Sequence, residues 1–503
     1  MALLYVDYFV KIYMTEGVKM SRVLDGLKPE RVFYYFEEIC NIPHISCHTE
    51  LLSDYCEEFA KSHGFRYKRD EFGNVIIYKN ASADYENVPA VIIQGHLDMV
   101  GAKEENSIHD FLTDPLQIMI EDGWVTAKGT TLGADNGIAV AMAFAILEDD
   151  SLKHPALEVV LTTDEEVGLC GADGIDPNDL SAKYMLNLDS EDEGVFLTGS
   201  AGGLGAEIGL LVNMVEFEGT EIKLIINNLK GGHSGAEIGT GRPSANVLMG
   251  RLLKALDDET DYYLRKMSGG VVDNAICPKC VASIVATVDE VDTIKSICER
   301  VMTELRQEYM GIDEGITITA NVGDNGVYEV CDDLGKDKIL CLLVNLPYGV
   351  MARSGFNVNF VETSLNLGIL EFKCGALKMV YSVRSSIQSA KRNLADRLWF
   401  LADYVGASYE ESGDYPAWTY NPNSTLRKII GDIYKEYSGK DAEFTTIHAG
   451  LECGIFADKL PGIDIVSYGP DMKDIHTFDE KMNIASVERV YEFTLKLLEN
   501  IKE

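Results

Sequence analysis

The sequence is short of basic residues. Its 503 residues include 44 lysines and arginines against 81 aspartates and glutamates, which gives a formal net charge of −37 at pH 7. A surface this acidic repels phosphate backbones and anionic lipid headgroups, so we expect no nucleic acid and no membrane as a partner. The charge favours solubility and does not by itself indicate a cationic substrate.

Long apolar segments are lacking as well. No stretch looks like the roughly 20 apolar residues that a membrane-spanning helix needs. The first residues are apolar but are interrupted by Asp7 and Lys11, and they lack the basic start and cleavage site of a signal peptide. We therefore predict a cytoplasmic protein. The globular pattern begins only at Ser21, so Met20 is an alternative start to Met1 and the sequence leaves that choice open.

Cysteines at the spacing of a metal or redox site occur only once. The 11 cysteines are odd in number and scattered, and only Cys277 and Cys280 form a Cys-x-x-Cys pair. One such pair without a second is a weak zinc signal, and no thioredoxin-like pattern surrounds it. We interpret the cysteines as reduced thiols of a cytosolic protein, several of them buried.

The apolar content is sufficient for more than one core. Hydrophobic residues make up 46% of the chain, and 503 residues are too many for a single compact core. Residues 1–200 contain short, continuously apolar runs, which are typical of strands buried on both faces of a parallel sheet. Residues 201–385 alternate amphipathic strands with single helices, which is typical of an α+β domain with an antiparallel sheet. Residues 386–503 return to the first pattern.

These patterns predict an α/β catalytic domain with a doubly wound, mostly parallel sheet. It consists of residues 1–200 and 386–503 and is interrupted by an inserted α+β domain at residues 201–385. The expected helices are residues 29–40, 49–64, 138–147, 243–256, 292–309, 386–404, 425–437 and 485–501. The strands expected in the inserted domain include residues 221–229 and 316–321.

Metal-binding side chains follow three of the short apolar runs. They are His96 and Asp98 after residues 88–94, Glu165 and Glu166 after residues 157–163, and Asp189 after residues 184–188. The carboxyl ends of parallel strands line one crevice, where ligands bind. Asp135 lies at a glycine-rich entry to the helix expected at 138–147, close to backbone N–H donors, and His476 lies in the loop 469–479.

Five of these residues can supply a two-metal site, namely His96, Asp135, Glu166, Asp189 and His476. In such a site a carboxylate is shared between two cations roughly 3.5–4 Å apart. Glu165 cannot easily bind the same metal as its neighbour Glu166, so we expect it to act as general base toward a metal-activated water. Asp98 is placed to hold the second ring nitrogen of His96. Two zinc ions are the expected cofactor, with manganese or cobalt as alternatives.

Each of these signals has an ordinary structural explanation when it is taken alone. A single histidine at a strand end is more often structural, and Asp-Glu-Glu in a loop is usually a solvated turn or a helix cap. Their joint occurrence favours the metal site. The other histidines with no such context, to which we assign no role, are His44, His48, His63, His109 and His154.

At these motifs the sequence resembles a known group of enzymes. Residues 94–100, 132–137, 163–168 and 187–191 are similar to the aminoacyl-histidine (Xaa-His) dipeptidases, also called cytosolic non-specific dipeptidases. That group belongs to the wider family of co-catalytic zinc exopeptidases and amidohydrolases. The resemblance runs from about Ser21 to the C-terminus. Residues 231–235, 448–454 and 474–477 point to the dipeptidase branch specifically.

The resemblance implies a role for each metal-site residue. His96 and Asp189 would hold one zinc ion, Glu166 and His476 the other, and Asp135 would bridge the two. Glu165 would be the general base and Asp98 the partner of His96.

The inserted domain, called a lid in this family, would supply further residues. Its His233 would stabilise the oxyanion, while its Asn274 and Arg384 would contact substrate, and His448, from the second part of the catalytic domain, is a further expected substrate contact. His233 follows a Gly-Gly turn whose bare backbone allows close approach, and its imidazole suits a developing oxyanion. The guanidinium fork of Arg384 suits the α-carboxylate of a peptide, although a surface salt bridge is the alternative reading for this arginine.

The predicted function is hydrolysis of unblocked dipeptides, including Xaa-His types, so that a small peptide is the expected partner. One alternative is an N-acyl-amino-acid deacylase or tripeptidase of the same wider family, which would use the same metal centre. An alternative of another class is a catalytically silent peptide-binding protein. The resemblance also implies a homodimer formed through the lid.

Overall fold

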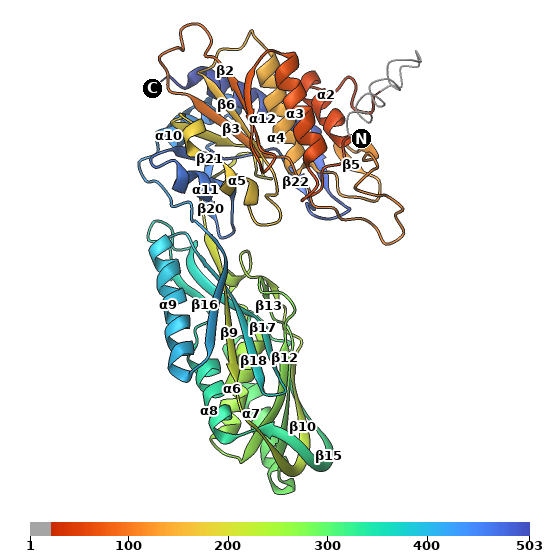
Figure 1. Ribbon diagram of the computed structural model, residues 1–503, viewed down its shortest axis with the longest axis vertical. Coiled ribbons are helices and arrows are strands. Elements are labelled where there is room, and N and C mark those ends of the chain that lie inside the picture. Colours follow the sequence, from red (N-terminus) through yellow and green to blue (C-terminus); the bar gives the residue numbers. More distant parts are fainter. Residues whose placement is uncertain (1–21, 503) are drawn as a thin grey trace. The chain divides into compact units, whose positions relative to one another are not determined.

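The computed structural model describes residues 22–502, so the choice between Met1 and Met20 lies outside the described residues. The chain forms two compact units (Figure 1). Unit 1 contains the residues up to Val195, residues Leu426–Ala442 and the residues from Val466 onward. Unit 2 contains Phe196–Thr425 and Glu443–Ile465. None of the helices between residues 22 and 502 combines the length and apolar content that crossing a membrane would require.

The central sheet of unit 1 has parallel strands in its middle. Its strand order begins β1 (Arg66–Arg69), β2 (Val75–Lys79), β6 (Leu157–Thr162), β3 (Val91–His96), β7 (Tyr184–Asn187) and β21 (Asp464–Ser467). Strand β3 runs parallel to β6 and β7, whereas β1 and β2 are antiparallel additions. Every residue of β3, β6 and β7 is buried, which explains the continuously apolar runs and confirms the predicted parallel sheet.

Helices cover both faces of this sheet. Figure 1 shows α2 (Glu30–Cys40), α3 (Glu50–Ser62) and α4 (Ala134–Glu148) on one side and α10 (Thr425–Ser438) on the other. Helix α4 is apolar on all sides because it packs against β3 and is covered by α2. The closing helix is α12 (Ile484–Asn500).

A small four-stranded sheet in unit 1 joins two distant segments of the chain. Its strand order is β22 (Met472–Lys473), β23 (Lys481–Asn483), β5 (Trp124–Ala127) and β4 (Ile118–Glu121). The register pairs Met482 with Val125. The loop 474–480, which connects β22 to β23, is thereby held next to the segment that follows β5.

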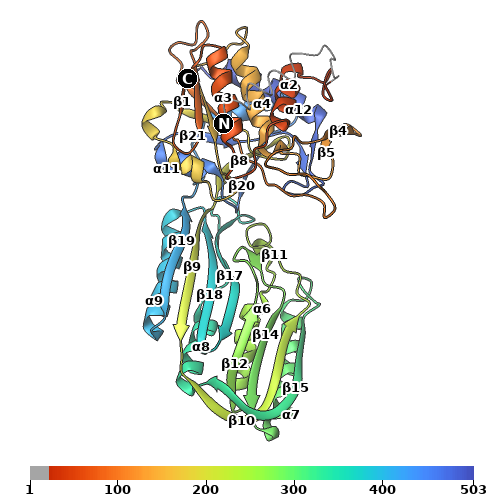
Figure 2. The same cartoon turned by 45° about the vertical axis from the view of Figure 1, so that its right-hand side comes forward.

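Unit 2 is built on a nine-stranded antiparallel sheet, whose strands lie side by side in Figure 2. The strand order is β15 (Thr317–Cys331), β10 (Met214–Asn227), β14 (Cys280–Ala286), β12 (Tyr262–Gly269), β17 (Val361–Lys373), β18 (Ala376–Ser385), β9 (Gly202–Leu211) and β19 (Ser408–Tyr415), with β16 (Gly349–Arg353) paired to β17.

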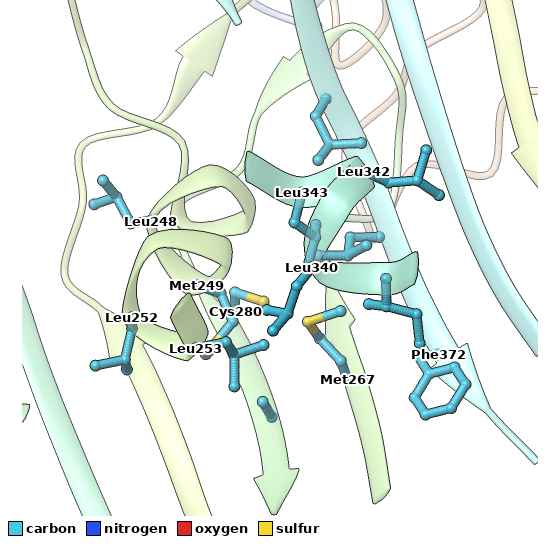
Figure 3. Close-up of a cluster of buried hydrophobic side chains, with 14 of the residues drawn as sticks. Leu248, Met249, Leu252, Leu253, Met267, Cys280, Leu340, Leu342, Leu343 and Phe372 are labelled. Atoms are coloured by element: carbon cyan, nitrogen blue, oxygen red, sulfur yellow. The ribbon is translucent and has the colours of Figure 1, made fainter. Parts of the chain in front are cut away.

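Four helices lie along one face of this sheet, as predicted for an α+β unit. They are α6 (Ala245–Asp257), α7 (Val291–Glu308), α8 (Asp333–Asn345) and α9 (Gln388–Val405). Figure 3 shows part of the core between these helices and the sheet, where Leu253 of α6 and Leu343 of α8 lie with Met267 of β12 and Cys280 of β14.

Residues 386–425 and Glu443–Ile465 lie with unit 2, which differs from our assignment of residues 386–503 to the catalytic domain. Strand β19 pairs with β9, and α9 packs on β9 and β18. The buried Lys391 of α9 donates hydrogen bonds to the carbonyl oxygens of Gly203 (3.2 Å) and Tyr415 (2.5 Å). The amphipathic pattern of α9 is compatible with either unit, so only strand pairing decides the assignment.

Candidate metal centre

His96 is the last residue of β3 and is fully buried. One ring nitrogen, Nδ1, lies 2.9 Å from the carbonyl oxygen of Asp98 and 3.5 Å from its carboxylate. The other, Nε2, lies 3.2 Å from Asp135 Oδ1 and 3.4 Å from Asp189 Oδ1. Asp98 therefore holds the ring through Nδ1, which leaves Nε2 facing the carboxylates of Asp135 and Asp189, as in metal-ligating histidines.

Asp98 also fixes the loop that carries two acidic residues. Its carboxylate accepts hydrogen bonds from the backbone N–H groups of Glu165 (2.9 Å) and Glu166 (3.3 Å) and from the Ser46 hydroxyl (2.8 Å). These donors, together with His96, outweigh burial and lower the pKa of Asp98. Asp98 thus positions both His96 and the loop after β6.

Asp135 lies between the two histidines. It is the second residue of α4, where the backbone is not yet helical. Its Oδ1 lies 3.2 Å from Nε2 of His96, and its Oδ2 lies 3.2 Å from Nε2 of His476. A carboxylate with one oxygen directed at each imidazole has the geometry of a bridging ligand.

The remaining two carboxylates complete the cluster. Glu166 follows β6 and lies 2.8 Å from Nε2 of His476, which belongs to the loop between β22 and β23. Asp189 follows β7. The ligand atoms of His96, Asp135 and Glu166 all lie within 4.8 Å of one another. The structure therefore brings the five residues named from the sequence into one cluster, with Glu165 on the same loop as Glu166.

The charges of this cluster fit divalent cations. Burial and the neighbouring Asp135 raise the pKa values of both Glu166 and Asp189. Hydrogen bonds to Asp135 and Glu166 raise the pKa of His476 to about 10. Three crowded carboxylates thus attract positive charge to their centre, and the donor set of two imidazoles and three carboxylates is one that zinc accepts.

Asn136 is a positioning residue to which we assigned no role from the sequence. It is fully buried, and its Oδ1 accepts a hydrogen bond from the backbone N–H of His96 (3.1 Å). Its Nδ2 donates to the carbonyl oxygen of Leu188 (2.8 Å). Asn136 therefore links the ends of β3 and β7 to the start of α4. A Cβ at Gly95 would meet Asn136 Oδ1 at 2.4 Å, so glycine is needed there.

Glu480 is a second residue that sequence reasoning missed. Its side chain is buried, and its carboxylate accepts hydrogen bonds from four consecutive backbone N–H groups, those of residues 132–135. Burial and the charge of Asp135 raise the pKa of Glu480 to about 7, against the opposing effect of these donors. No pattern in the sequence marks Glu480, because its hydrogen-bond partners are backbone groups.

Within unit 2, His233 and Asn274 lie at one short pair of antiparallel strands. Strand β11 (Gly232–His233) pairs with β13 (Ala275–Ile276), and the register places His233 opposite Ala275, the residue after Asn274. His233 is exposed on this strand pair. Partial desolvation of its ring and the charge of Arg384 lower its pKa.

The loop after His233 is held next to this strand pair by backbone hydrogen bonds. The N–H of Ser234 donates to the carbonyl oxygen of Asn274 (2.8 Å), and the N–H of Glu237 donates to that of His233 (2.9 Å). A Cβ at Gly235 would lie 2.7 Å from the carbonyl oxygen of His448, so this loop also lies against His448.

Arg384 and His448 lie close together in unit 2, Arg384 on β18 and His448 directly after β20 (Glu443–Ile447). Arg384 of β18 is the register partner of Ser364 on β17, and the Ser364 hydroxyl lies 2.7 Å from Nε2 of His448. Arg384 is buried, and its Nη1 donates to the hydroxyl of Tyr415 at 3.3 Å. Its Nε has no hydrogen-bond partner in the described part of the chain. Burial and the charge of Arg384 lower the pKa of His448 to about 4.

Unit 2 therefore holds as one group His233, Asn274 and Arg384, which we assigned to the inserted domain, and His448, which our division placed in the second part of the catalytic domain. Ser364 and Tyr415, which hold His448 and Arg384, were not singled out from the sequence. Nothing in their local pattern distinguishes them from other polar residues of a strand, so only the strand register reveals their positions.

Comparisons with known proteins show to which family the chain belongs. The sequence profile of peptidase family M20/M25/M40 matches residues 92–500. The cytosol non-specific dipeptidase of Escherichia coli is 37% identical over 482 residues, which cover 95% of this chain and 99% of that protein. The crystal structure of aminoacylhistidine dipeptidase from Vibrio alginolyticus superposes with a TM-score of 0.90 at 36% identity, covering 98% of this chain and 99% of that one.

More distant structures share the fold. The aminopeptidase PepT of Bacillus cereus superposes with a TM-score of 0.55 at 16% identity, over 95% of this chain and all of that one. The group named from the sequence motifs is confirmed by the two similar proteins described above. From its fold and these matches, the chain belongs to peptidase family M20/M25/M40 and is a hydrolase.

Proposed function

We propose that this protein is a two-zinc dipeptidase that hydrolyses unblocked dipeptides, including those with C-terminal histidine. The observation that carries the proposal is Asp135, whose two carboxylate oxygens each lie 3.2 Å from a different imidazole. The names of the two similar proteins support a dipeptide substrate. The name of the first and the free state of all eleven cysteines support a cytoplasmic location.

The cluster divides into two sets of ligands. We assign His96 and Asp189 to one ion, since their side chains lie 3.4 Å apart, and Glu166 and His476 to the other, since theirs lie 2.8 Å apart. Asp135 contacts both sets. Zinc bound to such donors supplies Lewis acidity, which lowers the pKa of water and polarises a carbonyl group.

The residues of the chain would divide the remaining work. Glu165 accepts the proton of the attacking water and returns it to the leaving amine, as a general base and acid within hydrogen-bond reach can do. Asp98 holds the Glu165 backbone and the His96 ring, so it sets the position of both. The imidazole of His233 stabilises the charge that develops on the carbonyl oxygen.

The buried guanidinium of Arg384 would recognise the C-terminal carboxylate of the peptide. A buried arginine whose Nε lacks a partner among the described residues favours an anion as ligand, because an unsatisfied buried charge is costly. His448 and Asn274 complete the contacts with substrate in this proposal. Manganese or cobalt are alternatives to zinc, and a homodimer is part of the proposal from the resemblance alone.

A panel of substrates tests this proposal. Metal-stripped protein should hydrolyse no dipeptide, and addition of zinc, manganese or cobalt should restore hydrolysis of unblocked dipeptides. Acetylation of the substrate's amino group should remove activity, and tripeptides should be poor substrates. Preferred hydrolysis of N-acyl amino acids or of tripeptides would establish the corresponding alternative enzyme. A protein that binds two zinc ions and hydrolyses none of these substrates would be a silent binding protein.

A further inference from the structure

One hairpin of unit 1 carries both a metal-site histidine and the buried Glu480. The hairpin consists of β22, the loop 474–480 and β23. It is anchored to β5 by the β23–β5 pairing and by the Thr126 hydroxyl, which donates to the carbonyl oxygen of Glu480 (2.9 Å). The positions of His476 and Glu480 are therefore set by the same anchor.

The Glu480 carboxylate is saturated by backbone donors of another segment. Its Oε2 accepts from the N–H groups of Leu132 (2.7 Å) and Gly133 (3.1 Å). Its Oε1 accepts from those of Ala134 (2.9 Å) and Asp135 (3.3 Å). The side chain is only 2% exposed, so water does not compete for these bonds.

The segment that Glu480 holds lacks regular structure of its own. Gly133 has a left-handed backbone (φ 68°), and Asp135 and Asn136 have non-helical angles although they lie at the start of α4. Helical hydrogen bonds therefore do not fix the direction of the Asp135 side chain. The convergence of four N–H groups on one carboxylate does so instead.

We propose that Glu480 is a positioning residue that fixes Asp135 as the shared ligand of two metal ions. This inference rests on the proposed function, because it assigns Asp135 to both ions. Without the Glu480 carboxylate, the segment 132–135 is released and one oxygen of Asp135 moves away from its imidazole. One of the two ions is then held less tightly, while the other keeps its remaining ligands.

The test is zinc titration of metal-stripped protein by calorimetry, with Glu480→Gln as the variant. The amide keeps one acceptor oxygen, but its nitrogen faces two N–H donors. Residues that orient metal-ligating side chains without contacting the metal typically contribute about 10–100-fold in metal affinity or activity. We expect one of the two binding events to weaken by about that factor, kcat to fall similarly, and KM for a dipeptide to stay within about twofold. Glu480→Asp, which keeps the charge on a shorter side chain, should lie between wild type and Glu480→Gln.

Glu158 provides a matched control within unit 1. It is also a buried carboxylate, and it accepts from the backbone N–H groups of Ser181 (3.0 Å) and Ala182 (3.3 Å) and from the Ser181 hydroxyl (2.6 Å). Glu158→Gln should lower Tm without changing either zinc-binding event. A Glu480→Gln protein with wild-type zinc binding and kcat but a lowered Tm would show a purely structural role and overturn the proposal.

Two further outcomes are decisive. Should Glu480→Gln fail to fold, Glu480→Asp carries the test, and wild-type zinc binding in that variant would overturn the proposal. Two zinc-binding events in wild-type protein that hydrolyses no dipeptide would refute the proposed function alone, because the effect of Glu480 on the titration would still be measured. Wild-type protein that binds fewer than two ions would overturn both.

Discussion

The two units contain polar clusters of opposite character. In unit 1 three carboxylates surround two imidazoles, and the pKa of His476 rises to about 10 because it lies among acids. In unit 2 His448 is buried near the guanidinium of Arg384, and its pKa falls to about 4. The same side chain, histidine, is therefore driven toward the charged form in one unit and toward the neutral form in the other.

From this contrast, the charge of the ligand that each cluster favours can be inferred from the charge of the cluster's own buried groups. Buried groups of one sign are costly unless a partner of the other sign neutralises them. The acidic cluster suits cations, and the cluster around Arg384 suits an anion such as a carboxylate. A dipeptidase needs both, because its substrate ends in a carboxylate and its chemistry needs an activated water.

The largest expected effect separates proton transfer from metal binding within unit 1. Glu165→Ala should lower kcat by about 10²–10⁴-fold, the usual contribution of a general base. The ligands are untouched, so metal analysis should still find two zinc ions per chain. Full activity in this variant would disprove the general-base assignment, and loss of zinc would show that Glu165 acts as a ligand.

The next largest expected effect tests whether Arg384 of unit 2 binds the C-terminal carboxylate of the peptide. Arg384→Lys keeps the charge but loses the guanidinium fork, and a hydrogen bond to a charged group contributes about 1.5–3 kcal/mol. We expect kcat/KM for dipeptides to fall by about 10–100-fold, with unchanged zinc content. Dipeptide amides, which lack the carboxylate, should be affected little.

Arg392 is the control for that substitution. It lies on α9 of the same unit and pairs with Glu411 at the surface. Arg392→Lys should leave kcat/KM within about twofold, since exposed ion pairs contribute little. Equal losses for dipeptides and their amides in Arg384→Lys would argue against carboxylate recognition.

The smallest effect is the pH dependence of stability that His448 contributes. Its folded pKa of about 4 lies below the ordinary value of 6.5, so the unfolded chain binds the proton first as the pH falls. His448 therefore reduces stability between about pH 6.5 and pH 4, by at most about 3 kcal/mol and by less where the ring meets solvent. Above pH 6.5 this contribution is absent.

Urea unfolding at pH 7 and pH 4.5 measures that effect. His448→Gln should lose stability at pH 7, because the bond with Ser364 changes, and the loss should shrink or reverse at pH 4.5. The exposed His48 serves as the control, and His48→Gln should show no such trend. If the free energies of unfolding of wild type and His448→Gln differed by the same amount at both pH values, the lowered pKa of His448 would be contradicted.

Much of the fold followed from the sequence because burial leaves a pattern. Residues of β3, β6 and β7 are buried without interruption, and the helices expected at 29–40, 243–256 and 292–309 lie within two residues of α2, α6 and α7. Exposed structure leaves no such pattern. Strands β10 and β15 extend well beyond the runs 221–229 and 316–321 from which they were expected, because their outer residues are largely exposed.

The residues of the site likewise fall into those that the sequence predicts and those that it does not. His96, Glu166 and Asp189 could be found because strand ends mark where side chains meet. Glu480 could not, because its partners are backbone groups, which carry no signature in the sequence. The assignment of residues 386–425 to unit 2 likewise depends on the pairing of β19 with β9, which the local sequence pattern does not encode.

The order of the cluster residues along the chain matters for biosynthesis. Four of the five precede unit 2, whereas His476 follows all of it. During translation the ribosome delivers this imidazole last. A nascent polypeptide that has not yet reached residue 476 therefore lacks one of the five proposed metal ligands. We expect hydrolytic activity only after the whole of unit 2 has been synthesised.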